Sequence, residues 1–353
     1  MKIGIPTEIK PLEGRVALIP AAAGDLVKAG HEVYVQSGAG VLAGFGDADY
    51  QSQAVQMVPT AQALYKQAKL IVKVKEPVEP EMQFLRKDHV LFSYLHLAAL
   101  PELTKELQRI GLTAIGFETV VGLNNDLPLL KPMSDIAGRL SIQIGAQLLH
   151  RPQGGKGLLL GGLPAAPRGT VVVLGAGVAG SNAARMAANL GADVIVLDKN
   201  LDRLEEARAM GNNVTALYPF QEQIAQAVAQ ADLLIGAVLI PGAKAPHLVT
   251  QEMVRSMQRG SVIIDIAVDQ GGCIETIRPT NYEQPTYVWE GIVHFGVTNM
   301  PGAVPRTACY ALSSALLPFI HQLALPDWQQ HVGLCAGINV QDGKIVHPAL
   351  LAG

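Results

Sequence analysis

The chain has 353 residues, enough for about two domains with substantial hydrophobic cores. Its formal net charge of −3 argues against a basic surface for nucleic acid, so no nucleic-acid partner is expected. Charged residues make up 16% of the sequence, below the ~25% typical of soluble domains, while hydrophobic residues reach 49%. This composition predicts a large buried parallel sheet, extensive contacts between subunits, or both.

Composition also bears on membranes, metals and cell compartment. No apolar run approaches the ~20 residues of a membrane-spanning helix, and the longest, Leu233–Ile240, has strand length. The first ten residues are typical of a strand that ends in charge, not of a signal sequence. The three cysteines, Cys273, Cys309 and Cys335, are odd in number and too scattered for a zinc site. We therefore expect free thiols, no metal, no membrane contact and a cytoplasmic protein.

In the first third of the chain, short apolar strands alternate with helical stretches. Strands are predicted at Lys2–Ile5, His31–Val35, Leu70–Val74, Val90–Tyr94 and Thr113–Phe117. Helices are predicted near Ala21–Ala29, Ala61–Ala68 and Pro101–Ile110. Such alternation is typical of an α/β domain with a mostly parallel sheet.

A second series of strands follows a long apolar helix, Met133–Leu149, and a glycine-rich stretch at residues 153–157. These strands are predicted at Val171–Leu174, Val194–Leu197, Leu233–Val238, Ser261–Val268 and Ile292–Val297. Another apolar helix, Thr307–Leu323, precedes a strand–turn–strand pattern at Gly337–Pro348. We expect an α/β fold with two Rossmann-like domains, connected by the two long helices. One comprises residues 1–130 plus about 305–353, and the other about 131–304.

The second series opens with a dinucleotide-binding fingerprint. A β-branched strand leads into Gly175-x-Gly177-x-x-Gly180, an alanine-rich helix and a second strand that ends on Asp198. The first glycine permits a tight turn, the second lets the backbone approach a pyrophosphate, and the third lets the helix pack closely on the strand. Asp198 lies about 20 residues beyond the first glycine, where the ribose-binding acid of such folds is found. Because strand, helix, second strand and acid all occur together, we favour nucleotide binding over a merely structural glycine turn.

Four further residues lie at predicted strand ends or in loops: Arg15, Lys75, His96 and Asp269. Each has a structural alternative. The two cations could be solvated surface charges, the imidazole a buried core histidine and the acid a loop cap. Together they form a chemically sensible set, with two cations for a carboxylate, one imidazole for proton transfer and one acid near a nicotinamide. The other acids and histidines in similar places are expected to be structural: Glu8, Glu76, Glu118, His31 and His294.

Nearly end to end, the chain resembles the alanine dehydrogenases. The matching segments include IGIPTEIKPLEGRVAL, KVKEP, YLHLA, PLLKPMSDIAGRLS, VVVLGAGVAG, SVIIDIAVDQGGCIETIRPT and TNMPGAVPRTA. The resemblance implies a homohexamer with two Rossmann-like domains per subunit. It implies reversible, NAD-dependent oxidative deamination of L-alanine to pyruvate and ammonia.

Residue by residue, the resemblance places Arg15 and Lys75 on the substrate carboxylate and makes His96 and Asp269 catalytic. The residues that it and the glycine fingerprint assign to NAD are Ser134, Gly175, Gly177, Val178, Ala179, Gly180, Asp198, Arg203, Val238, Leu239, Ile266, Ala267, Val268, Asp269, Arg278, Val297, Thr298, Asn299 and Met300.

Two segments depart from the family pattern. Residues 218–220 read Tyr-Pro-Phe where the family usually has a Tyr-Ser pair, so the resemblance does not carry a hydroxyl contact to adenosine onto this segment. Lys199, directly after Asp198, replaces an apolar residue. The tail after Leu323 is short and divergent, and no function is carried onto it.

The main alternative is the NAD-binding subunit of proton-translocating transhydrogenase, which shares the GAGVAG turn and the two-domain plan. A subunit that binds only a nucleotide has no use for an amino-acid carboxylate site, so Lys75 and His96 favour the dehydrogenase. A third class, a noncatalytic NAD-binding protein of the same fold, is disfavoured by the complete catalytic set.

Overall fold

The structure is a computed structural model, and it describes residues 1–238 and 246–351. The chain divides into two compact units. The first comprises Met1–Met133 and Gly302–Gly353, and the second comprises Ser134–Pro301. The first boundary falls within helix α5 (Lys131–Leu148), which therefore carries the chain from one unit to the other.

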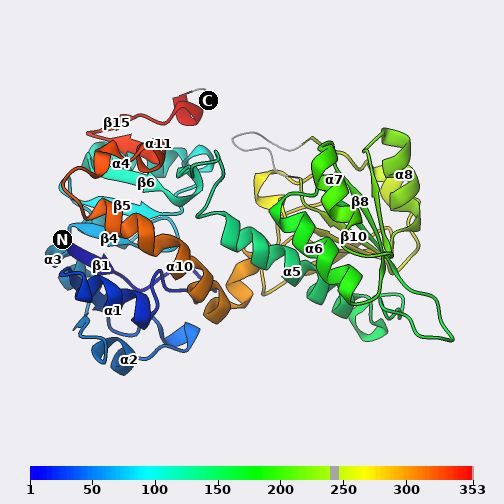
Figure 1. Cartoon of the computed structure of the whole chain (residues 1–353), viewed down its shortest axis with the longest axis horizontal. Helices are drawn as coiled ribbons and strands as arrows, with labels where there is room; N and C mark the ends of the chain where they lie inside the picture. The colour runs from blue at the N-terminus through cyan, green and yellow to red at the C-terminus, as the bar shows by residue number, and fades with distance from the viewer. Residues whose placement is uncertain (239–245, 352–353) are drawn as a thin grey trace. The chain divides into compact units, whose positions relative to one another are not determined.

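The sheet of the first unit has eight strands among the described residues, in the order β15-β14-β6-β5-β4-β1-β2-β3 (Figure 1). Their bounds are β1 Lys2–Ile5, β2 Glu32–Gln36, β3 Gln56–Val58, β4 Leu70–Val72, β5 Val90–Ser93, β6 Thr113–Gly116, β14 Ile338–Gln341 and β15 Lys344–Ile345. Strands β1 to β6 are parallel. The C-terminal strand β14 is antiparallel to β6, so the tail joins this sheet at its edge.

The sheet of the second unit has seven strands within the described ranges, in the order β12-β13-β11-β10-β7-β8-β9. Their bounds are β7 Thr170–Leu174, β8 Asp193–Leu197, β9 Val214–Leu217, β10 Leu233–Gly236, β11 Val262–Asp265, β12 Thr286–Trp289 and β13 Ile292–Phe295. All are parallel except β12, which is antiparallel to β13.

Helices connect the parallel strands within each unit. Besides α5, their bounds are α1 Pro20–Lys28, α2 Asp47–Gln51, α3 Ala61–Gln67, α4 Pro101–Ile110, α6 Val178–Asn189, α7 Leu201–Arg208, α8 Gln221–Gln230, α9 Gln251–Arg255, α10 Pro305–Leu323, α11 Val332–Ala336 and α12 Pro348–Leu351. Helices α1, α4 and α10 each begin at a proline, whose fixed φ suits the first helical position and whose missing N–H costs nothing there. Within the described residues, no helix combines the length and hydropathy needed to cross a membrane.

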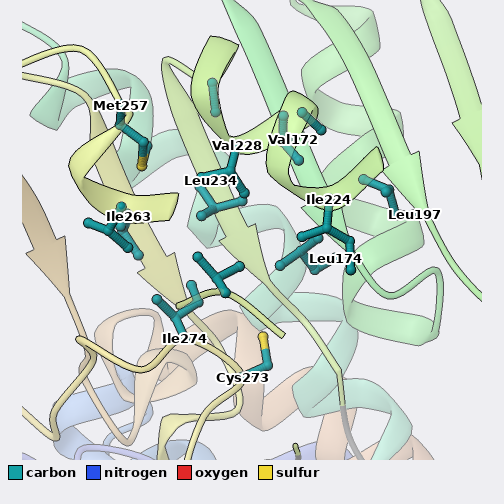
Figure 2. Packing of buried hydrophobic residues seen from close by; sticks show 14 of the residues in the cluster. Val172, Leu174, Leu197, Ile224, Val228, Leu234, Met257, Ile263, Cys273 and Ile274 are labelled. Atoms are coloured by element: carbon teal, nitrogen blue, oxygen red, sulfur yellow. The ribbon is translucent and has the colours of Figure 1, made fainter. Parts of the chain in front are cut away.

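Several central strands are buried along their whole length, which explains their continuous apolar sequences. Every residue of β4, β10 and β11 is buried, as expected for parallel strands covered on both faces. In the second unit, one hydrophobic cluster packs β7, β10 and β11 against α8 and α9. Figure 2 shows members of this cluster converging from these elements, among them Val172, Leu174, Ile224, Val228, Leu234 and Ile263.

The predicted fold class is confirmed, since both sheets are mostly parallel and have the Rossmann strand order 3-2-1-4-5-6 in their parallel part. Six predicted strands were too long at their C-terminal ends. Leu70–Val74, Val90–Tyr94 and Thr113–Phe117 end at Val72, Ser93 and Gly116. Leu233–Val238, Ser261–Val268 and Ile292–Val297 end at Gly236, Asp265 and Phe295. The apolar residues beyond those ends belong to loops and turns. Their apolar character alone made the predicted strands too long. The short strands β3, β9 and β12 were not predicted, because three or four residues give little periodicity.

Candidate functional site

In each unit, the strand order reverses beside the first strand, between β1 and β4 and between β7 and β10. Open α/β sheets bind ligands at such a switch point, at the carboxyl ends of the strands. In the first unit, Arg15 lies in the loop after β1, Lys75 follows β4 and His96 follows β5. Three of the four predicted catalytic and substrate residues therefore leave neighbouring strands at the switch point of one sheet.

Two of these side chains touch. Lys75 Nζ lies 3.3 Å from His96 Nε2. An ammonium group only donates hydrogen bonds, so a protonated Lys75 assigns Nε2 as the acceptor of a neutral imidazole. Burial lowers the pKa of Lys75; the Glu76 carboxylate opposes this shift, and the positive charge of Arg15 adds to it. The pair is thus a cation beside a proton-accepting nitrogen.

Arg15 is not a solvated surface charge, since only 3% of the residue is exposed. Its guanidinium donates to both Glu13 oxygens, from Nε over 2.7 Å and from Nη2 over 2.5 Å. Helix α10 holds the same loop: the Val16 N–H contacts Cys309 Sγ at 3.1 Å and the Ile19 N–H donates to Ser313 Oγ at 2.9 Å. Arg15 is therefore a buried cation on a braced loop.

His96 has an unusual backbone conformation. Its φ of +50° is left-handed, which costs a residue other than glycine roughly 1–2 kcal/mol. Its main-chain N–H donates to Glu118 at 2.6 Å, and its imidazole stacks on the ring of Tyr94 at 6.1 Å between centroids. The Tyr94 hydroxyl in turn donates to the Leu129 carbonyl at 2.6 Å. The imidazole is thus held at a fixed turn.

A buried charged cluster supports the loop after β4. Lys73 is completely buried, and its ammonium contacts Glu81 at 2.8 Å and Glu8 at 3.4 Å. Burial lowers the pKa of Lys73, but these two carboxylates raise it by a larger amount. The pKa of Lys73 therefore lies above its ordinary value. Burial also raises the pKa of Glu8, while Lys73 counteracts that effect.

Glu8, Glu76 and Glu118, which we expected to be structural, all border the predicted site residues. Glu8 accepts the main-chain N–H of Lys75 at 3.3 Å, Glu76 lies 3.7 Å from Lys75 Nζ, and Glu118 accepts the N–H of His96. Glu13 was missed altogether. Their one shared signal in the sequence is position, because each lies in a loop that follows a parallel strand.

The glycine fingerprint of the second unit has the expected geometry. Gly175 has a φ of +92°, which the turn after β7 requires. A Cβ on Gly180 would lie 1.8 Å from the Gly175 carbonyl oxygen, so helix α6 and the turn are in close contact. Among the described residues, the one atom within 4 Å of a Cβ on Gly177 is Arg203 Nη1, at 4.0 Å. The backbone at Gly177, the N-cap of α6, is therefore open to a ligand, with the positive end of the helix beside it.

Asp198 directly follows β8 and lies beside this turn. Its carboxylate accepts the N–H of Ala176 at 2.6 Å and that of Asn200 at 2.8 Å, and Arg203 Nη1 lies 4.0 Å away. Lys199 is exposed. Asp198 thus links the glycine turn to the end of β8, at the position predicted for ribose binding.

Other predicted cofactor residues follow the next strands of the same sheet, at the carboxyl ends of β10, β11 and β13. These are Val238, Ile266, Ala267, Val268, Asp269, Val297, Thr298, Asn299 and Met300. Ser134 is the first residue of the second unit and lies in α5. Arg278 lies over the ring of Tyr287, 4.3 Å from its centroid. Leu239 lies outside the described residues.

Asp269 is exposed in a 3₁₀ turn, Val268–Gln270, that follows β11. Asp265 stabilises this turn, because its carboxylate accepts hydrogen bonds from the N–H groups of Ala267 at 2.9 Å and Cys273 at 2.8 Å. Burial raises the pKa of Asp265 to about 6, against the lowering effect of these hydrogen bonds.

Cys273, Cys309 and Cys335 are free thiols, and the described residues contain no cluster of metal-binding side chains.

Fold and site together define a two-unit α/β protein with a glycine-rich strand–turn–helix in one unit and a group of two cations and an imidazole in the other. Two family descriptions match the chain: "Alanine dehydrogenase/PNT, N-terminal domain" over residues 4–137 and "Alanine dehydrogenase/PNT, C-terminal domain" over residues 141–348. The chain belongs to the alanine dehydrogenase/PNT family, and the resemblance inferred from the motifs is confirmed.

Curated relatives and solved structures agree with this family. The chain is 49% identical to the alanine dehydrogenase of Geobacillus stearothermophilus, covering 100% of this chain and 96% of that protein. It is 48% identical to that of Methanococcus maripaludis, covering 99% and 95%. A solved L-alanine dehydrogenase has a TM-score of 0.96 and 51% identity, covering 100% of this chain and 98% of that one. A transhydrogenase from Sinorhizobium meliloti has a TM-score of 0.86 and 27% identity, covering 99% and 100%.

Proposed function

We propose that the chain is an L-alanine dehydrogenase that reversibly converts L-alanine to pyruvate and ammonia with NAD. The observation that supports this most is the contact of Lys75 Nζ with His96 Nε2 at 3.3 Å, in the unit that also holds the buried Arg15. A carboxylate-binding cation beside a proton acceptor is what oxidation of an amino acid requires. Nearly half of all residues are identical to those of curated alanine dehydrogenases over the whole chain.

The second unit fits NAD. The open backbone at Gly177 and the N-terminus of α6 suit a pyrophosphate, and Asp198 suits the ribose hydroxyls. Bound NAD would supply the acceptor for the hydride that leaves the alanine Cα. The remaining NAD-binding residues are those predicted from the resemblance. They follow the carboxyl ends of β7, β8, β10, β11 and β13, with Ser134 and Arg278 in addition.

The residues of the first unit would bind the substrate and move its protons. Arg15 and Lys75 would hold the carboxylate and so fix the orientation of Cα, and positioning of this kind contributes several kcal/mol to catalysis. Once the substrate carboxylate binds the ammonium group of Lys75, Nε2 of His96 can accept a proton. The proton would come from the substrate amine or from the water that adds to the iminium carbon. Imidazole can take and return protons near neutral pH, as the reversible reaction requires. Asp269 would be the second catalytic residue, orienting the attacking water.

We further propose a homohexamer that works in the cytoplasm. The low charge content, 16%, supports burial of surface between subunits, and three free thiols suit a reducing compartment. Light scattering of the purified protein tests the assembly, and a monomer of 37.4 kDa would contradict it.

The function is tested by mixing the purified protein with NAD and L-alanine at alkaline pH and recording NADH formation. The alternative, a transhydrogenase-like subunit without a small substrate, is supported by the TM-score of 0.86 with the Sinorhizobium meliloti protein. That alternative predicts NADH binding without any alanine-dependent turnover. We expect side activities with other small amino acids, because a methyl-sized pocket discriminates by only about 1–3 kcal/mol per methylene.

A further inference from the structure

The two site residues that touch each other, Lys75 and His96, are held by the same device. One carboxylate accepts both the main-chain N–H of the site residue and that of the residue before it. At His96 this carboxylate is Glu118: Oε1 accepts from His96 N at 2.6 Å and from Leu95 N at 3.1 Å. At Lys75 it is Glu8, which accepts from Lys75 N at 3.3 Å and from Val74 N at 2.5 Å.

The bonds to Glu118 matter because the backbone of His96 is left-handed, with a φ of +50°. A residue with a Cβ leaves this region readily unless its surroundings fix it there. Two consecutive N–H groups on one carboxylate fix the direction of the chain at this turn. Loss of the carboxylate lets the turn relax, and the imidazole then moves away from the position at which it meets Lys75 Nζ.

Glu118 is itself fixed by the C-terminal tail. It lies in the 3₁₀ turn Phe117–Thr119 directly after β6. The Gly116 N–H donates to the Gly337 carbonyl at 2.9 Å, and Thr119 Oγ1 donates to the same oxygen at 3.0 Å. The tail therefore anchors both ends of the turn that carries Glu118.

The tail also reaches the loop of His96 directly. Helix α12 packs near the 3₁₀ turn Leu97–Ala99 that follows His96. Leu350 of this helix packs on the hydrophobic cluster that contains Leu95 and Leu97. The divergent tail thus contacts both the turn that carries Glu118 and the loop that follows His96.

We propose that Glu118 is a positioning residue for the oxidation of alanine and that it acts on His96 through the main chain. The inference rests on the proposed function. Glu118 orients His96 by accepting hydrogen bonds from the main-chain N–H groups of Leu95 and His96. We therefore expect that glutamine, which is uncharged but keeps an acceptor oxygen, can take over the role of Glu118.

The test compares Glu118→Ala and Glu118→Gln with Glu102→Ala, a control on α4 whose side chain is 84% exposed. Steady-state kinetics with alanine, NADH titration and hydrogen–deuterium exchange of the Leu95 and His96 amides are measured on the full-length protein. We expect Glu118→Ala to lower kcat by about 10- to 100-fold, the scale of a misplaced catalytic group. NADH affinity stays within about twofold of wild type, and both amides exchange faster.

Glu118→Gln keeps an oxygen that can accept both N–H groups, so it restores kcat to within about fivefold of wild type, and it keeps the test open if Glu118→Ala does not fold. The proposal is overturned if Glu118→Ala retains wild-type kcat and amide exchange. It is equally overturned if Glu118→Gln folds but is as impaired as the alanine variant, because charge would then be essential. If wild-type protein does not oxidise alanine, the proposed function fails, and amide exchange alone decides whether Glu118 fixes His96.

Discussion

Replacing Gly180 by alanine tests the cofactor turn most sharply, because the structure fixes the size of the conflict. The added Cβ would lie 1.8 Å from the carbonyl oxygen of Gly175, whereas real Cβ contacts stay beyond 3.0 Å. The obstacle is main chain and not a flexible side chain, so helix α6 must move by more than 1 Å relative to the turn after β7.

The free energy of unfolding should fall accordingly. Forcing an extra methyl into a packed site typically costs about 1–3 kcal/mol, and a rigid main-chain partner places this variant at the upper end. A loss of about 3 kcal/mol lowers the melting temperature of a unit of this size by roughly 6–12 °C. Because the moved helix also carries the N–H groups that would face the pyrophosphate, NADH affinity falls as well.

Gly177→Ala is the matched control. Its Cβ would enter space in which the nearest described atom is 4.0 Å away, so the melting temperature should change little. The methyl would instead occupy the approach to the helix N-terminus. Loss of one hydrogen bond to a charged phosphate costs about 1.5–3 kcal/mol, so NADH affinity falls by about 10- to 100-fold.

The assay is differential scanning calorimetry together with fluorescence titration of NADH for wild type and both variants. We predict that Gly180→Ala loses stability and affinity, while Gly177→Ala loses only affinity. Wild-type melting and affinity in Gly180→Ala would refute it, as would equal destabilisation by the two substitutions.

Three further predictions concern the chemistry. His96→Ala should lose about 100-fold or more in kcat with NADH affinity intact, the usual scale for removing a general acid–base; a near-normal kcat with an unchanged pH profile would move that role to Asp269. Burial lowers the pKa of Lys75 below its ordinary 10.5, and only the protonated form binds a carboxylate. The KM for pyruvate should therefore rise with pH before pH 10.5, and Lys75→Arg should shift this rise to higher pH; a KM independent of alkaline pH would contradict it. Asp198 repels a 2′-phosphate, so kcat/KM for NADP should be at least about 100-fold below that for NAD, and equal values would show that Lys199 compensates.

Much of the fold could be predicted because its signal is local. Central strands such as β7 and β10 are buried on both faces, and their continuous apolar sequences reveal them directly. The glycine fingerprint is equally local, since Gly175 and Gly180 are required by contacts within one strand–turn–helix unit. Strand ends were harder to predict, because Ile266 and its neighbours are apolar yet turn away from the sheet.

The supports of the site could not be predicted in the same way. Glu118 meets His96 across 22 positions of sequence, and Glu8 meets Val74 across 66. Both carboxylates accept hydrogen bonds from main-chain N–H groups. Because every residue except proline has such a group, the residue types at positions 74 and 96 do not reveal that a glutamate binds there. A glutamate in a loop is also most often a solvated charge. Only the order of strands in the folded sheet brings these carboxylates to the residues that they hold.

We expect this chain to oxidise L-alanine by transferring the hydrogen on Cα to NAD. This transfer can be followed with L-alanine deuterated at Cα and mass spectrometry of the reduced cofactor and of the keto acid formed. We predict pyruvate, ammonia and NADH that carries the deuterium. Absence of alanine-dependent NADH, or NADH without deuterium, would contradict it.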